Sequence, residues 1–119
     1  MEIFGHEYGF MLTVGASAEV AELCPGGDLT RISEALDGRF ADTVEVTARF
    51  VVAMASGYDA ARIYAGEPVE HPALTVDMLK ALSFAKFQEV QRAAMASFRG
   101  DTTPSVEVEP AKKNETLNA

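Results

Sequence analysis

The chain has little cysteine and no long apolar stretch, and each scarcity excludes a class of protein. A single cysteine, Cys24, excludes an intrachain disulfide and a cysteine-rich zinc site. Because the residues around Cys24 lack the signature of a catalytic nucleophile, we interpret it as a small buried apolar residue. The longest nearly uncharged stretch, residues 50–58, is far too short to cross a bilayer. Residues 1–10 lack the basic and apolar regions of a signal peptide, so we expect a cytoplasmic protein that binds no membrane.

Basic residues are also scarce. The 119 residues include 10 Lys or Arg against 18 Asp or Glu, which gives a net charge of −8, and the longest basic run is Lys112–Lys113. Nucleic-acid binding needs clustered Lys and Arg to contact phosphates, so we expect no nucleic-acid partner. With 48% hydrophobic and 24% charged residues, the composition is that of a globular domain that needs no metal or disulfide to fold.

Short apolar pieces near the N-terminus predict a β-hairpin. Residues 2–4 and 8–12 form its expected strands, and Gly5 supplies the backbone freedom that the turn requires. A two-stranded hairpin is marginal in water and leaves unpaired edges, so it must lie on helices or pair with another copy of the chain. We therefore expect a homo-oligomer with four self-association residues, namely Ile3, Phe4, Tyr8 and Phe10.

Apolar residues at helical spacing predict the rest of the fold. The first expected helix runs from Gly15 to the stop at Pro25, and the second from the cap Asp28 to Gly38. The third runs from the cap Asp42 to an interruption or end at Gly57, followed by short helical turns over 58–64. The last runs from Thr75 or Asp77 to Gly100. The fold class is thus mostly α (α+β), with residues 1–100 forming a small helical domain that carries the N-terminal hairpin. Residues 101–119 contain two prolines and no aromatic residue, which predicts a disordered, flexible tail.

A search for catalytic constellations finds none. His6 and Glu7 are adjacent, so in a strand they point to opposite faces. His71 has Glu70 beside it, and two ligands are too few for a metal site. Residues 26–30 contain two glycines but lack the lysine and spacing of a phosphate-binding loop, and a helix cap explains them better. We therefore expect no catalytic residue, no metal and no cofactor, and a protein that is not an enzyme.

The final helix offers the best candidate for a contact surface. Leu82 and Phe84 lie about 200° apart on a helical wheel, so they and Phe87 cannot all face one narrow core stripe. We predict that Leu82, Phe84 and Phe87 bind a helical partner, as aromatic anchors and adaptable methionines do in other interfaces. The alternative is that all of these large residues fill the core of the domain itself.

The order of these features resembles the tail assembly chaperones of long-tailed bacteriophages. The likeness covers residues 1–100 and is carried by the hairpin Ile3-Phe4-Gly5-His6-Glu7-Tyr8-Gly9-Phe10-Met11-Leu12, the Gly57 segment, the loop 67–73 and the helix led by Thr75. The first strand departs from the family pattern because it lacks a Lys or Arg. The resemblance implies a non-catalytic protein of the host cytoplasm that coats the tape measure protein, keeps it soluble and helps recruit the tail tube protein.

Two other functions stay open. The charge of −8 suits a small acidic adaptor or regulatory protein, of bacterial or mobile-element origin, that binds a cationic surface on a host protein. A small-molecule-binding or catalytic α domain would instead need a deep pocket in which His6 or His71 lies beside carboxylates. Gene context distinguishes the tail assembly chaperone from the acidic adaptor, because only a gene for a tail chaperone precedes a very long helical coding sequence.

Overall fold

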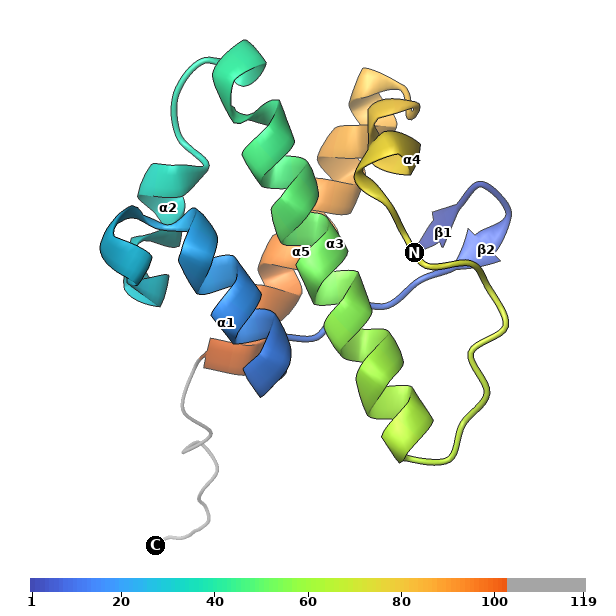
Figure 1. Cartoon of the computed structure of the whole chain (residues 1–119). Helices are drawn as coiled ribbons and strands as arrows, with labels where there is room; N and C mark the ends of the chain where they lie inside the picture. The colour runs from blue at the N-terminus through green and yellow to red at the C-terminus, as the bar shows by residue number, and fades with distance from the viewer. Residues whose placement is uncertain (103–119) are drawn as a thin grey trace, which may run out of the picture.

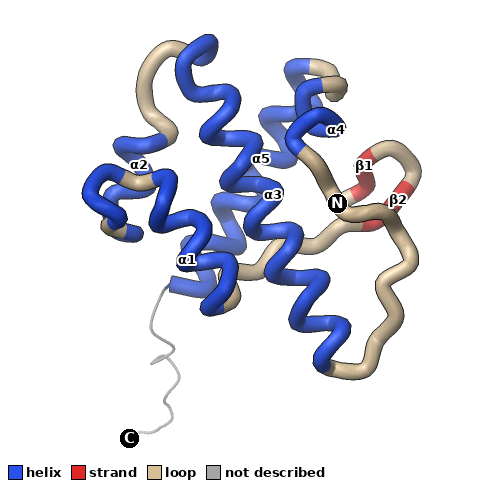
Figure 2. The backbone as a smooth tube through the Cα atoms, viewed as in Figure 1, coloured by secondary structure: helices blue, strands red, loops and turns tan. Residues whose placement is uncertain are grey.

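The computed structural model describes residues 1–102, which form a helical body with a small N-terminal hairpin (Figure 1, Figure 2). The elements are β1 (Glu2–Ile3), β2 (His6–Glu7), α1 (Val14–Leu23), two 3-10 turns (Pro25–Gly27 and Leu29–Arg31), α2 (Ile32–Ala35), α3 (Phe40–Tyr64), α4 (Val76–Lys80) and α5 (Phe84–Thr102). The predicted mostly α (α+β) class with an N-terminal hairpin is confirmed. Residues 103–119, which hold most of the predicted tail, lie outside the described part of the chain.

The 25-residue helix α3 is the centre of the molecule, and α1, α4 and α5 all pack against it (Figure 1). Its buried face is built from small and large apolar residues that alternate at helical spacing, among them Ala48, Val51, Met54 and Ala55. Val20 of α1, Leu79 of α4 and Val90 of α5 close the same core from three sides. Burial of this stripe compensates for the β-branched residues that weaken the intrinsic helix propensity of α3.

The hairpin is shorter than the sequence analysis predicted. Glu2 pairs with Glu7 and Ile3 with His6, so the second strand is residues 6–7 and not residues 8–12. Phe4 and Gly5 both have positive φ values, 50° and 84°, which is the two-residue turn that suits the twist of a tight hairpin. Backbone hydrogen bonds continue one pair beyond the strands, because the Tyr8 amide donates to the Met1 carbonyl and the N-terminal ammonium donates to the Tyr8 carbonyl, both at 2.9 Å. Residues 8–13 then lead across α3 to α1 (Figure 1).

Gly57 does not interrupt α3, contrary to the prediction, and the helix continues to Tyr64. The extended segment 8–13 crosses α3 at this glycine, where the Met11 amide donates to the Met54 carbonyl at 3.0 Å. A Cβ atom on Gly57 would lie 2.5 Å from the Met11 oxygen and 2.9 Å from the Thr13 Oγ1. Gly57 is therefore required for the close approach of two backbones.

The predicted final helix is two helices. Of the two predicted starts, Thr75 and Asp77, the structure has Thr75. Its Oγ1 accepts a hydrogen bond from the Met78 amide at 3.1 Å and so caps α4. The helix then breaks at residues 81–83, and the Ser83 hydroxyl accepts from the Lys86 amide in the first turn of α5. Gly100 does not end α5, which continues to Thr102.

The other predicted starts are right for Asp28 and wrong for Asp42. Asp28 accepts from the Thr30 amide at 3.0 Å and begins the helical segment that contains α2. The helix α3 begins earlier than predicted, at Phe40, so Asp42 lies in its first turn. There the Asp42 carboxylate pairs with Arg39 at 2.7 Å instead of capping the backbone.

Candidate partner-binding surface

A small apolar groove lies where the start of α3 meets α4 and the start of α5. It has a volume of about 210 Å³, and we call its lining the aromatic patch: Phe40, Val44, Leu79, Lys80, Leu82, Phe84 and Phe87. The three residues predicted to bind a partner, Leu82, Phe84 and Phe87, all belong to it. The break at residues 81–83 brings them together, because it lets the chain turn between Leu79 on α4 and Phe87 on α5.

The aromatic patch has a buried floor and an exposed rim. Leu79 and Phe87 form the floor, with Phe87 only 4% exposed, and both belong to the main core. Phe84 and Phe40 form the rim and are 58% and 49% exposed. The Phe40 ring meets the Phe84 ring at a centroid distance of 5.2 Å and the Phe87 ring at 6.1 Å, both edge to face. These contacts orient the exposed rings relative to each other and to the buried Phe87 ring.

Ion pairs flank the apolar residues of the aromatic patch, and one of these pairs includes its Lys80. The Lys80 ammonium lies 2.6 Å from Glu45, and Arg49 approaches the other oxygen of Glu45 at 3.4 Å. The hydrogen bond from Lys80 and its positive charge lower the pKa of the Glu45 carboxyl, so this group stays ionised. Arg39 and Asp42 form a further pair on the first turn of α3. Apolar residues at the centre and charged residues around them are the usual composition of a protein–protein interface.

The sequence analysis found one side of this surface and missed the other. Phe84 is exposed, Leu82 is half-buried and Phe87 belongs to the core, so the core interpretation holds for Phe87, and partner binding through Phe84 stays a prediction. Phe40 and Val44 were missed because they lie on α3, some forty residues earlier. The available signal was an aromatic residue at a helix start, just after Gly38 and Arg39.

The four proposed self-association residues also differ in burial. Ile3 and Tyr8 are completely buried in the chain's own core, where they fasten the hairpin to the helices. Phe10 is half-buried against that core. Phe4 is 54% exposed at the tip of the hairpin, so of the four it is the residue with the largest exposed fraction, and its role in self-association stays a prediction.

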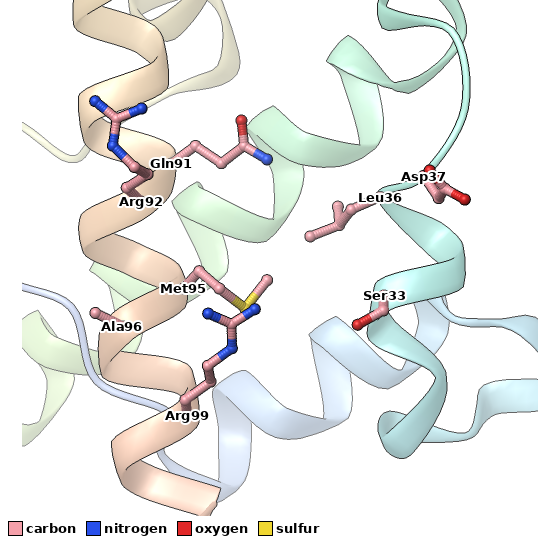
Figure 3. A pocket seen from close by; sticks show the side chains of 8 residues that line it. All are labelled: Ser33, Leu36, Asp37, Gln91, Arg92, Met95, Ala96 and Arg99. Carbon is pink, nitrogen blue, oxygen red and sulfur yellow. The ribbon is translucent and has the colours of Figure 1, made fainter.

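A second groove, of about 590 Å³, separates α2 from α5 (Figure 3). Figure 3 shows Met95 reaching from α5 toward Leu36, the residue that follows α2, with Arg99 one turn further along α5. The lining is mixed: Ser33, Leu36, Asp37, Gln91, Arg92, Met95, Ala96 and Arg99. It offers a broad opening between two helices and no concentration of apolar anchors comparable to the aromatic patch.

One histidine lies beside a carboxylate in the structure. His71 lies between α3 and α4, and its Nε2 is 3.2 Å from the Oδ1 of Asp59 on α3. Both atoms are buried, and their two residues belong to the lining of a pocket of about 320 Å³ between α3 and the loop that precedes α4. His6 and His71 line one surface groove, and within residues 1–102 no three His, Cys, Asp or Glu side chains are placed to hold a metal ion.

Cys24 is buried, as we interpreted it, and its Sγ lies 3.3 Å from the Val20 carbonyl. Burial and the nearby charge of Asp28 raise the pKa of the thiol, so the reactive thiolate is disfavoured.

The described helices contain no segment that is both long enough and apolar enough to span a bilayer. Comparison of the chain with family models, curated proteins and solved structures gave no match.

Proposed function

We propose that this chain is a non-catalytic assembly chaperone that binds an apolar helical stretch of a long partner. By the resemblance of its hairpin and helix order, this is a phage tail assembly chaperone of the host cytoplasm, and the partner is the tape measure protein. Covering the apolar stretch keeps the partner soluble until the tail tube protein is recruited around it. In this proposal the chaperone works as a homo-oligomer, with several copies along one partner.

The observation that carries the proposal is the aromatic patch. Small monomeric domains place most of their large apolar residues inside, yet two phenylalanines stand half-exposed and in contact at one spot. The rings are already fixed by edge-to-face packing, so binding would cost little side-chain entropy. A groove of this kind fits the apolar face of a helix, which inserts side chains at positions i, i+3 and i+4.

The test is co-purification with the product of the downstream gene, which the proposal requires to be the tape measure protein. Phe84→Ala should weaken binding by about 2 kcal/mol, or roughly thirtyfold in Kd. Ile63→Ala is the matched control, because Ile63 is also 58% exposed but lies at the opposite end of α3. It should leave binding unchanged.

The outcomes separate the proposed functions. If Phe84→Ala and Ile63→Ala both bind like the wild type, the aromatic patch is not the binding surface. In that case the acidic adaptor becomes the better proposal, and binding should instead fall when salt is raised. If the downstream product does not bind the wild-type chain at all, the tail chaperone proposal is wrong.

A further inference from the structure

One buried histidine fastens the loop of residues 65–75, which joins α3 to α4. The loop leaves the end of α3, passes the hairpin and returns to α4 (Figure 1). The His71 side chain is 7% exposed and contacts Asp59 of α3 at 3.2 Å. Its ring also lies against the Tyr8 ring, with centroids 4.2 Å apart and planes tilted by 49°. His71 thus connects the loop to both α3 and the segment that follows β2.

Both ring nitrogens of His71 face hydrogen-bond acceptors. The Nδ1 atom is 3.0 Å from the Pro72 carbonyl oxygen, and the Nε2 atom faces the Asp59 carboxylate. A neutral imidazole carries one N–H, so in either tautomer one nitrogen lone pair would point at an oxygen. Only the imidazolium form places a proton on both nitrogens. The Asp59 Oδ1 and His71 Nε2 atoms are buried and have no aligned hydrogen bond within residues 1–102, so their contact depends on the protonation of the imidazole.

We propose that His71 is a protonation-dependent latch for this loop. As imidazolium it holds residues 65–75 against Asp59 and Tyr8, and on losing its proton it releases them. The proposal does not depend on what the aromatic patch binds. It assigns the loop two states, closed when the imidazole is protonated and loosened when it is neutral, and histidine side chains in general change charge between about pH 5 and pH 8.

The other groups around the latch leave this assignment intact. The Tyr8 hydroxyl donates to the Pro72 carbonyl at 2.7 Å, and burial, followed by the charge of Asp59, raises the pKa of Tyr8, which therefore stays protonated when histidine titrates. The groove beside His71 carries four more titratable or charged residues: His6, Glu7, Arg62 and Glu70. Arg62 is already bonded to Glu67 at 3.1 Å and to the Pro68 carbonyl at 3.0 Å, which secures the first part of the loop.

Limited proteolysis of the full chain tests the latch, because cleavage inside the loop requires local opening. Thermolysin cleavage within residues 67–75 is followed by mass spectrometry at pH 5.5 and pH 8.0. Each rate is divided by the rate on an unstructured peptide of the loop sequence at the same pH. In the wild type the normalised rate should be higher at pH 8.0 than at pH 5.5. His6→Gln, which changes the other and exposed histidine, should behave like the wild type.

Two variants, His71→Gln and Asp59→Asn, test whether the pH dependence of cleavage comes from the contact between these two residues. His71→Gln should be cleaved at the fast rate at both pH values. Asp59→Asn should lose the pH dependence, because an amide N–H can donate to a neutral imidazole. The proposal is overturned if the wild type shows no rise, or if either variant keeps the wild-type pH dependence. Should His71→Gln fail to fold, the nearly isosteric Asp59→Asn still gives the answer.

Discussion

Replacing Gly57 by alanine has two opposite effects on stability: it raises the helix propensity of α3, and it disturbs the contact between α3 and residues 8–13. Alanine is better than glycine inside a helix by about 1 kcal/mol, so propensity alone predicts that Gly57→Ala stabilises α3. The added Cβ, however, would lie 2.5 Å from the Met11 oxygen, 2.9 Å from the Thr13 Oγ1 and 3.0 Å from the Ala16 Cβ. The first of these neighbours is backbone and cannot rotate away.

The structure allows the size of the effect to be estimated. Overpacking of this kind costs about 1–3 kcal/mol, and displacing residues 8–13 also strains the hydrogen bond from the Met11 amide to Met54, worth about 1 kcal/mol. After the gain in propensity is subtracted, we expect Gly57→Ala to lower the free energy of unfolding by about 2 kcal/mol. For a domain of this size the melting temperature should fall by about 10 °C.

The matched control is Gly15→Ala, in the first turn of α1, where a Cβ would meet nothing within 4 Å. This change should be neutral or should stabilise by about 0.5 kcal/mol. Thermal and urea denaturation of the two variants and the wild type measure the difference. A Gly57→Ala protein as stable as Gly15→Ala would refute the reasoning, because it would mean that residues 8–13 do not cross α3 where the structure places them.

Further predictions concern the aromatic residues. Phe87→Ala, at the buried floor of the aromatic patch, should cost about 3–4 kcal/mol of stability, whereas Phe84→Ala should cost under about 1 kcal/mol in urea denaturation; equal losses would contradict the difference in burial. Because burial raises the pKa of Tyr8 above its ordinary 10.0, the unfolded chain loses this proton first, so stability should decline as the pH rises above 10. Tyr8→Phe should lessen that decline and Tyr64→Phe, at a 93% exposed position, should not. Phe4→Ser should lower the mass seen by light scattering if the hairpin tip joins copies of the chain, and an unchanged mass would exclude that role.

Local signals predicted the helix starts that depend on one side chain. Asp28 and Thr75 were found because a cap acts on amides two or three residues away, which the sequence displays directly. Gly57 was misjudged for the opposite reason. Its role depends on the Met11 backbone, 46 residues earlier, and no local pattern reports that approach.

The candidate surface was predicted in part and through a wrong premise. The 200° separation of Leu82 and Phe84 assumed one continuous helix, but the chain breaks at residues 81–83 between them. No proline or glycine marks this break, because Ser83 and the packing of Leu79 and Phe87 on α3 produce it. The three residues still meet in one patch, yet Phe40 completes it from a distance that helical periodicity does not cover.

The latch and the aromatic patch are joined by a helix that is too short to stand alone. The helix α4 has five residues and depends on the Thr75 cap, the buried Leu79 and the Lys80–Glu45 pair. It follows directly on the loop that His71 fastens, so loosening the loop should loosen α4 and the floor of the aromatic patch with it. Coupling between two sites is reciprocal, so a partner that needs an ordered patch should bind more tightly at pH 5.5 than at pH 8.0 and should favour protonation of His71. Titration calorimetry with the downstream product should find this pH dependence in the wild type and lose it in His71→Gln; the same dependence in both proteins would mean that the two features act independently.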